Sequence, residues 1–545
     1  MEPSPSEAPR AHVARNAGVI GLAVMASRVL GLVRDQVFAV FFGAGFHYDA
    51  FLTAFRIPNL LRDLFAEGAL SSAFVATFTQ VLEKKGEKEA RLLSNRVATL
   101  IIIAIALISV VGWYGAPAIV ATLAPGFSQL PGKAELAIEL TRIMIPFLLF
   151  VALAAQAMGV LNAHGRFAIP ALASAFFNLG SIIGGLLLGF VLGPYLDLSP
   201  IAGMAYGTLI GGFLQFAVQW PSLRAVGFTY RPVLSLTDPG VRQIVGMMGP
   251  AVIGTAAVQI NVFINTNFAS SIVDPATGLV INGPVSWLNY AFRFMQFPIG
   301  VFGVAIATAA LPQLSRESAR ADYDRFRRTM VHALTLVFVL CIPSAVGLAV
   351  LARPIIALIF EHGRFTSFDT MQTGNALAAY AIGLSGYAAV KVLSPAFYAF
   401  GDARTPMLIS LGSIAVNYIM NSLLVVHFGH VGLAVSTSSV AVVNFLLLGF
   451  FMRRKLGRIG GRELGANALR IAVASVPLAL VAWAVNELVP LMPLAGFALA
   501  LTRVASAITL AATTFYLACR WLGVEEVNEA ASAIGGRFRR LLRRT

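Results

Sequence analysis

Residues 24–40, VMASRVLGLVRDQVFAV, are an apolar run that nevertheless contains Arg28, Arg34 and Asp35. With the apolar residues on either side, the run reaches the roughly 20 residues that a helix needs to cross about 30 Å of hydrocarbon. An ionisable side chain at that depth costs about 2.5–3.5 kcal/mol on insertion scales. The stretch therefore indicates a membrane-spanning helix whose charges have a role inside the membrane.

The composition of the whole chain agrees with this interpretation. Of its 545 residues, 58% are hydrophobic and 12% are charged, and the mean hydropathy is +0.79. Soluble domains contain about 25% charged residues, so the chain is not an ordinary soluble enzyme, a disordered chain or a small secreted scaffold. Its two cysteines, Cys341 and Cys519, form no disulfide framework or metal-ligand spacing. We therefore expect no metal and no cofactor.

We predict an all-α polytopic membrane protein with about 14 spans, because an open sheet cannot satisfy its backbone hydrogen bonds in lipid. The expected spans are 16–42, 47–80, 93–116, 136–162, 169–192, 200–221, 243–272, 285–314, 329–351, 370–400, 405–427, 431–452, 467–488 and 495–522.

The net charge of +15 comes from basic residues that occupy alternate gaps between spans. They are Lys84, Lys85, Lys88 and Arg91; Arg166; Arg224, Arg231 and Arg242; Arg316, Arg320, Arg325, Arg327 and Arg328; Arg404; and Arg453, Arg454, Lys455, Arg458 and Arg462. The opposite gaps contain few basic residues, with Lys133, Arg353 and Arg364 as exceptions. This alternation follows the positive-inside rule, so it predicts cytoplasmic termini rather than a nucleic-acid surface.

The sequence also contains an internal repeat. Ala54-Phe55-Arg56 recurs as Ala291-Phe292-Arg293, 237 residues later. The same offset relates Pro117 and Gly126 to Pro354 and Gly363, and an offset of 236 relates Gly165 and Pro170 to Gly401 and Pro406. Each repeat covers six spans, so both repeats start on the same side, as in transporters that work by alternating access around a site near the midplane.

The repeat and the charge pattern together predict six regions. They are a cytoplasmic N-terminal tail (1–15), an N-lobe (16–221), a cytoplasmic linker (222–242), a C-lobe (243–455), two additional helices (456–522) and a basic cytoplasmic C-terminal tail (523–545). Glycine-rich stretches at 180–189 and 207–212 indicate close helix packing rather than phosphate loops.

Polar residues concentrate in three of the spans. Besides Arg28, Arg34 and Asp35 in the first, the second carries a stripe of Arg56, Asn59, Asp63 and Glu67 at helical spacing, with Arg62 beside it. In the eighth, Arg293 corresponds to Arg56 by the repeat and has Ser286 and Gln296 at helical spacing. Arginines from both halves would then line one net positive cavity. Arginine binds phosphate oxygens in a bidentate manner, so the expected substrate is a phosphate or diphosphate.

A structural role for these charges is the alternative interpretation. Arg34 would pair with Asp35, or Arg62 with Asp63 and Glu67, to hold helices together. Adjacent residues do not face each other on a helix, so such pairs are expected to need partners on other helices. The histidines at span ends, including His430, are expected to be solvated, and the chain shows no catalytic constellation.

Several long motifs resemble the MurJ (MviN) family of lipid II flippases, within the multidrug/oligosaccharidyl-lipid/polysaccharide exporter superfamily. They occur in the order of the family and span essentially the whole chain. The motifs are SRVLGLVRDQVFAVFFGAGFHYDAFLTAFRIPNLLRDLFAEGALSSAFV (27–75), APGF (124–127), VSWLNYAFRFMQFPIGVFGVAIATAALPQLS (285–315) and KVLSPAFYAFGDARTP (391–406).

The resemblance implies translocation of undecaprenyl-diphosphate-linked peptidoglycan precursor, lipid II, from the cytoplasmic to the periplasmic leaflet of the bacterial inner membrane. It also implies that the additional helices line a groove for the lipid tail. The family's substrate-binding positions match Arg28, Arg34, Asp35, Asn59, Arg62, Glu67, Ser286 and Arg293. Asp49, Arg56, Asp63 and Gln296 are supporting positions; Asp63 replaces an arginine of some relatives, and Gln296 an acid.

The function expected from the resemblance has alternatives that the sequence leaves open. An ion-coupled exporter of small cationic or amphipathic molecules on the same fold would have a cavity dominated by carboxylates. A membrane protein that only recruits cell-wall enzymes would tolerate loss of the arginines. For the flippase, the energy source, a coupling ion or the membrane potential, is open, as is any partnership with cell-wall synthesis enzymes; no nucleic-acid partner is expected.

Overall fold

The computed structural model describes residues 8–63, 70–489 and 496–532. Within these ranges the chain is helical, and the one isolated β-bridge joins Val273 to Val280. The predicted all-α fold is therefore confirmed. Among the described residues, ten helices are long and apolar enough to cross a membrane; the predicted number of about 14 spans stays a prediction.

Two of the helices are broken by glycine. α3 (Ser71–Leu123) has a non-helical residue at Gly86, with φ of 80°, and α16 (Arg404–Leu456) has one at Gly429, with φ of 54°. Residues with positive φ commonly end helices, and glycine adopts this conformation without a steric penalty. Each of the two therefore contains two helical segments, and the breaks lie at or near the gaps predicted between spans.

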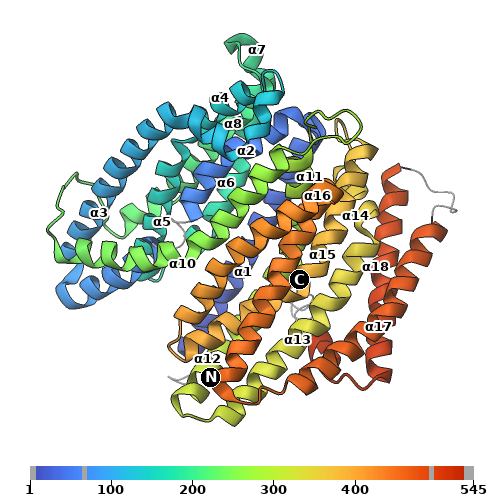
Figure 1. The fold of residues 1–545 in the computed structure, drawn as a ribbon. Helices are drawn as coiled ribbons and strands as arrows, with labels where there is room; N and C mark the ends of the chain where they lie inside the picture. Colours follow the sequence, from blue (N-terminus) through green and yellow to red (C-terminus); the bar gives the residue numbers. More distant parts are fainter. Residues whose placement is uncertain (1–7, 64–69, 490–495, 533–545) are drawn as a thin grey trace. The chain divides into compact units, whose positions relative to one another are not determined.

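Two compact units make up the chain, Met1–Gly283 and Pro284–Thr545, here called unit 1 and unit 2. Their helices are drawn in Figure 1. Unit 1 contains α1 (Ala8–Phe42), α2 (Phe46–Leu61), α3, α4 (Lys133–Met144), α5 (Phe147–Ala163), α6 (Ala168–Leu186), α7 (Gly193–Leu196), α8 (Pro200–Ala217), α9 (Trp220–Ala225) and α10 (Pro239–Ser270). Unit 2 contains α11 (Pro284–Pro298), α12 (Val304–Ala319), α13 (Tyr323–Val350), α14 (Ala352–Phe360), α15 (Ser367–Ala399), α16, α17 (Gly461–Leu488) and α18 (Gly496–Trp521).

The boundary between the units differs from the lobes that the sequence suggested. α10 packs against α3 and belongs to unit 1, although its residues were expected to open the C-lobe at 243. Part of the reason is an ion pair between Arg96 of α3 and Asp238, whose carboxylate also caps the start of α10. The six-region division stays a prediction.

Glycines bring α6 and α8 of unit 1 into close contact, as their sequence pattern predicts. A Cβ built on Gly207 would lie 2.4 Å from Cα of Gly185, and one built on Gly203 would lie 2.3 Å from Cα of Gly189. No side chain fits in such a space, so only glycine allows this approach. Beside this contact, the rings of Phe147 and Phe177 lie 5.4 Å apart.

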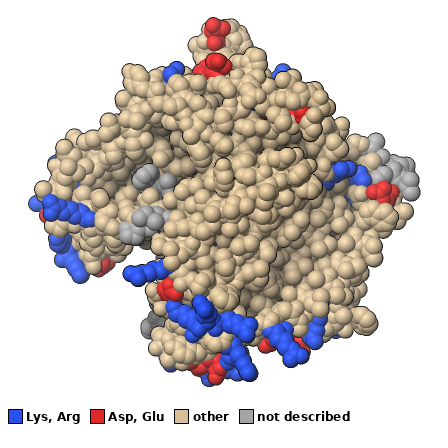
Figure 2. Space-filling model, viewed as in Figure 1, with Lys and Arg blue, Asp and Glu red and all other residues tan. Residues whose placement is uncertain are grey.

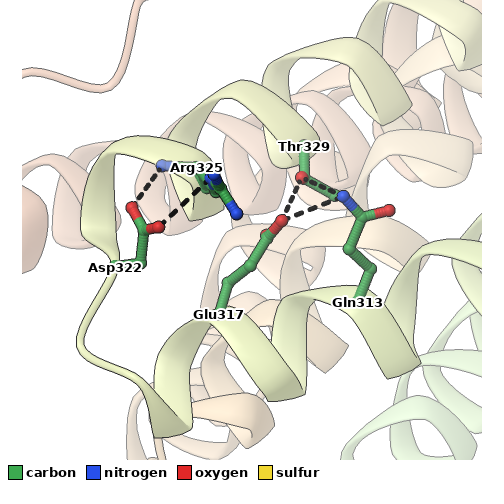
Figure 3. A network of polar contacts seen from close by, with 5 residues as sticks. All are labelled: Gln313, Glu317, Asp322, Arg325 and Thr329. Carbon is green, nitrogen blue, oxygen red and sulfur yellow. Dashed lines mark hydrogen bonds and ion pairs between the residues drawn. The ribbon is translucent and has the colours of Figure 1, made fainter.

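Polar contacts fix the turn between α12 and α13 in unit 2 (Figure 3). Glu317 Oε1 accepts hydrogen bonds from Gln313 Nε2 at 2.9 Å and from Thr329 Oγ1 at 3.0 Å. Asp322 caps the start of α13 by accepting the backbone N–H of Arg325 at 3.1 Å. Basic side chains gather at this end of unit 2, whereas most of the face drawn in Figure 2 is uncharged, as expected for a surface in lipid.

The internal repeat is visible in backbone conformation. Gly165 follows α5 and Gly401 follows α15, and both have φ of 71°. In both turns the next backbone N–H donates to a carbonyl five residues earlier, which is the Schellman arrangement. The bonds run from Arg166 to Leu161 at 2.9 Å and from Asp402 to Phe397 at 3.1 Å. α6 and α16 then begin 236 residues apart, which is the same offset as between Gly165 and Gly401.

Candidate functional site

The charged residues of α1 lie along the helix that packs against α6. Arg34 Nη2 donates to Asp35 Oδ1 at 3.3 Å, and its guanidinium lies 5.6 Å from the centroid of the Phe177 ring in α6. The Asp35 side chain is 4% exposed and that of Arg34 18%. Asn178 of α6 donates to the carbonyl of Ser27 at 3.1 Å, which fixes the helix one residue before Arg28. Arg28 itself is exposed.

A second pair lies at the end of α2. Arg62 donates to Asp63 Oδ1 through Nη2 at 3.0 Å and through Nε at 3.3 Å. The other oxygen of Asp63 accepts from Gln259 Nε2 of α10 at 3.1 Å. Both members of the pair are partly exposed, at 23% and 31%. α2 contains Pro58, which cannot donate a backbone hydrogen bond, and the helix widens to π geometry at Arg62.

The expectation that sequence neighbours cannot pair was wrong for these two arginines. Successive side chains leave a helix about 100° apart, but these two arginines reach back to the adjacent carboxylate because an arginine side chain is long and flexible. Arg34 donates from Nη2 to Asp35, and Arg62 donates from Nη2 and Nε to Asp63. The adjacent acids therefore orient both guanidinium groups.

Asp49 has another role than the arginine pairs. Its Oδ2 accepts from Lys133 Nζ at 2.9 Å and from the backbone N–H of Gly283 at 2.7 Å. Lys133 also donates to Asn282 Oδ1 at 2.7 Å and lies 4.2 Å from the centroid of the Phe127 ring. Asp49 is 1% exposed and Lys133 0%. This buried junction explains why Lys133 departs from the charge pattern of its gap: it is an internal counter-ion.

The candidates of unit 2 lie on α11. Ser286 is fully buried, Arg293 is partly exposed, and Gln296 is exposed. α11 then passes into a π-helical segment at Ile299, 237 residues after the same change at Arg62. π segments are rare and are frequent at functional sites. Their recurrence at one repeat position marks the polar ends of α2 and α11 as related features.

The structure thus brings together Arg34 with Asp35, and Arg62 with Asp63, whereas Asp49 pairs with Lys133. Arg56 and Asn59 are partly exposed on α2. Glu67 lies outside the described residues. In the described part of the chain no group of three or more metal-ligating side chains occurs.

Two buried contacts escaped the sequence analysis. Lys133 was noted only as an exception to the charge pattern, and His430 was expected to be solvated. His430 is 6% exposed, its Nε2 lies 3.1 Å from the carbonyl of Gln372, and its ring lies 5.0 Å from that of Trp287. Trp287 Nε1 in turn donates to Asp369 at 2.9 Å. The signal in the sequence that could have indicated burial is that Lys133 and His430 each lie where a helical segment begins.

Comparison with known proteins identifies the family of the chain. Residues 38–519 match the family model described as "Lipid II flippase MurJ". The lipid II flippase MurJ of Burkholderia cenocepacia is 37% identical over 433 residues, covering 79% of this chain and 81% of that protein. The probable lipid II flippase MurJ of Vibrio cholerae is 37% identical over 437 residues, with the same coverage.

Solved structures show the same fold. A lipid II flippase MurJ in an inward closed conformation aligns with a TM-score of 0.74 and 27% identity, over 92% of this chain and 99% of that chain. An inward-facing multidrug transporter of the MATE family aligns with a TM-score of 0.60 and 16% identity, over 81% of this chain and 95% of that one, which shows the fold alone. The family match and the identity over four fifths of the chain settle the relationship: this chain belongs to the MurJ family of lipid II flippases.

Proposed function

We propose that this multi-pass membrane protein translocates lipid II, the undecaprenyl-diphosphate-linked precursor of peptidoglycan, from the cytoplasmic to the periplasmic leaflet by alternating access. It is a transporter, not an enzyme. Family membership over most of the chain supports the substrate, and the MurJ structure in an inward closed conformation supports the alternation of states.

The observation that carries the proposal is the state of the arginines in unit 1. Arg34 and Arg62 lie in or directly after apolar helices, remain partly exposed, and each contact the acid that follows them in sequence. A guanidinium held by a carboxylate is oriented, and phosphate oxygens accept hydrogen bonds from the same kind of N–H group. The proposed site consists of Arg28, Arg34, Asp35, Asn59, Arg62, Glu67, Ser286 and Arg293, with Asp49, Arg56, Asp63 and Gln296 in supporting roles.

The acids have a defined part in this proposal. A diphosphate competes with Asp35 and Asp63 for the same guanidinium donors, because both ligands accept hydrogen bonds through anionic oxygens. The carboxylates orient the arginines before the substrate binds, and the ion pairs form again when the substrate leaves. Transport requires the diphosphate to be bound more tightly in one state than in the other, and competing carboxylates provide such a difference.

The remaining parts of the proposal concern placement and energy. Both termini are cytoplasmic, as the distribution of basic residues indicates, and the protein lies in the bacterial inner membrane. α17 and α18, which pack against α13 and against each other, contact the lipid tail. A coupling ion or the membrane potential drives the cycle, and cell-wall synthesis enzymes are its expected neighbours.

Depletion of the protein in its host, with lipid II quantified in each leaflet, tests the proposal. Lipid II should accumulate on the cytoplasmic side, and the intact chain should relieve it. Arg28→Ala, Arg34→Ala, Arg62→Ala and Arg293→Ala variants, matched for membrane abundance, should not. An unchanged leaflet distribution would contradict the proposal and favour an exporter of small cationic molecules, whose site would depend on carboxylates.

A further inference from the structure

A partly open cavity of about 170 Å³ is lined by residues of unit 1 and lies apart from the arginines of α1 and α2. Its walls come from one face each of α3 and α5, from the end of α8 with α9, and from the segment after α9. Representative residues are Ala98 of α3, Ala157 of α5, Trp220 of α9 and Phe228. Protein interiors contain few voids larger than a water molecule, so a space of this size in a helical bundle calls for an occupant.

The walls present hydrocarbon to the cavity. Its most buried polar side chains bond to each other: Gln156 Nε2 donates to the Ser94 carbonyl at 2.7 Å and lies 3.1 Å from Ser94 Oγ. Tyr230 OH lies 3.2 Å from Thr99 Oγ1. Water in a buried site needs two to four polar partners, and apolar cavities of about 150 Å³ stay dry and take apolar molecules. The chemistry of the walls therefore selects an apolar ligand.

The segment 227–238, here called the strap, closes one end of the cavity with Phe228 and Tyr230. Gly227, with φ of 74°, ends α9, and the next N–H, that of Phe228, donates back to Leu223 at 2.9 Å. This turn directs Phe228 into the wall. The strap then follows α3, where Arg231 N–H donates to Asn95 Oδ1 at 3.3 Å, and it ends at the Arg96–Asp238 ion pair.

The rim beside the strap is cationic. The Arg224 guanidinium lies 5.4 Å from the centroid of the Trp220 ring. The Arg91 guanidinium lies against Gly227, since a Cβ built there would be 2.5 Å from its Nη2. Arg231 is exposed on the strap. Among the described ion pairs, the acid that contacts these three arginines is Glu87, which pairs with Arg91. Tryptophan and tyrosine with basic neighbours are typical of the depth of lipid headgroups.

We propose that this cavity is a binding site for an anionic phospholipid of the leaflet at the basic end of unit 1. Part of one acyl chain fills the cavity, and the phosphate contacts Arg224 and its basic neighbours. The site is separate from the residues assigned to lipid II, so it does not rest on the proposed function.

Quenching of Trp220 fluorescence by phosphatidylglycerol brominated on its acyl chains tests the site in the purified full-length chain. The Trp220 signal is the difference between the intact chain and Trp220→Phe. Ala98→Leu fills the cavity, whereas Ala104→Leu adds the same volume on the exposed face of α3 and is the matched control. Brominated phosphatidylcholine tests whether the headgroup charge matters.

Brominated phosphatidylglycerol should quench Trp220 at several-fold lower concentration than phosphatidylcholine, in the intact chain and in Ala104→Leu, and Ala98→Leu should abolish this difference. Arg224→Gln, on an exposed side chain, should raise the phosphatidylglycerol concentration needed several-fold and leave phosphatidylcholine unchanged, so the proposal stays testable if Ala98→Leu does not fold. Equal quenching by both lipids, or undiminished quenching in Ala98→Leu, would overturn it.

Discussion

The two units join equivalent helices by different chemistry. In unit 1, the starts of α2 and α4 are linked by the buried ion pair of Asp49 and Lys133. In unit 2, the starts of α11 and α15 are linked by a hydrogen bond from Trp287 to Asp369. An offset of 237 would place Ser286 and Thr370 where unit 1 has the charged pair.

The difference shows which features the repeat retains. The glycine turns after α5 and α15, the starts of α6 and α16, and the π segments that begin at Arg62 and Ile299 recur at offsets of 236 or 237, because they determine the path of the backbone. The side chains that join the helices do not recur, since any well-satisfied polar contact can hold two helix ends together. Asp369 also forms a capping box with Thr366. Its carboxylate therefore accepts from the backbone N–H and the hydroxyl of Thr366 and from the Trp287 indole, rather than from a lysine.

The largest effect on stability is expected from Lys133→Ala. Removing one partner of a buried ion pair costs about 3–5 kcal/mol, because the other charge stays buried without compensation. The thermal unfolding midpoint of the purified protein should fall strongly. Lys88→Ala, at an exposed lysine of α3, is the control and should change little.

Combining Lys133→Met with Asp49→Leu sharpens this test. Replacing a whole buried pair by apolar residues is often neutral or stabilising, so the double variant should regain most of the lost stability. A single Lys133→Ala variant as stable as the intact chain would show that the buried pair does not hold α2 to α4.

The arginine sites should lose about 10- to 100-fold in lipid II translocation on replacement by lysine. Arg34→Lys and Arg293→Lys keep the charge but lose the planar fork, and a hydrogen bond to a charged group contributes about 1.5–3 kcal/mol. Translocation rates in vesicles measure the effect. Arg320→Lys, at an exposed arginine, is the control. Full activity of both lysine variants would mean that charge alone suffices.

Trp287→Phe should destabilise the protein by about 1–3 kcal/mol, less than Lys133→Ala. The change leaves Asp369 Oδ1 without the indole donor, while Thr366 N–H and Oγ1 still donate to its Oδ2, at 3.0 and 2.9 Å. The unfolding midpoint is the measurement, and Trp483→Phe, at an exposed tryptophan, is the control. A loss as large as that of Lys133→Ala would remove the distinction between the two junctions.

The smallest effect concerns the turn that follows α15. Burial acts to raise the pKa of Asp402, but hydrogen bonds from Lys455 and Thr405 outweigh it and lower the pKa to about 2. A lowered folded-state pKa stabilises above the unfolded value of about 4 and loses this contribution as the pH falls towards 2. The pair is partly exposed, so the contribution is about 0.2–1 kcal/mol.

Asp402→Asn should therefore be slightly less stable than the intact chain at pH 5 and equal to it near pH 2. Unfolding midpoints at both pH values measure the gap between the two proteins. Unit 1 has Arg166 at the equivalent turn. Introducing Arg166→Gln into both proteins should leave the difference between their unfolding midpoints unchanged. A gap of the same size at both pH values would contradict the assignment.

Much of the fold follows from the sequence because membrane spans and repeats depend on local patterns. Apolar length predicts helices, and the recurrence of Gly165 and Gly401 predicts two turns that have the same φ. The glycine stretches of α6 and α8 predict their close contact. Each of these features needs only neighbouring residues and the properties of the bilayer.

The pairing of side chains needs more than neighbouring residues. Lys133 and Asp49 are 84 residues apart, and only the fold shows that both are buried. The pairing of Arg34 with Asp35 depends on rotamers that a helical-wheel argument ignores. The membership of α10 in unit 1 depends on contacts with α3, while the repeat alone would place it in the second half.

Translocation of fluorescent lipid II in vesicles that contain the purified protein tests the central claim most directly. The intact chain should move lipid II between leaflets, and Arg34→Ala and Arg293→Ala, reconstituted in equal amounts, should reduce the rate to that of protein-free vesicles. Undiminished translocation by both variants, or no translocation by the intact chain, would contradict the claim that arginines from both halves bind the diphosphate.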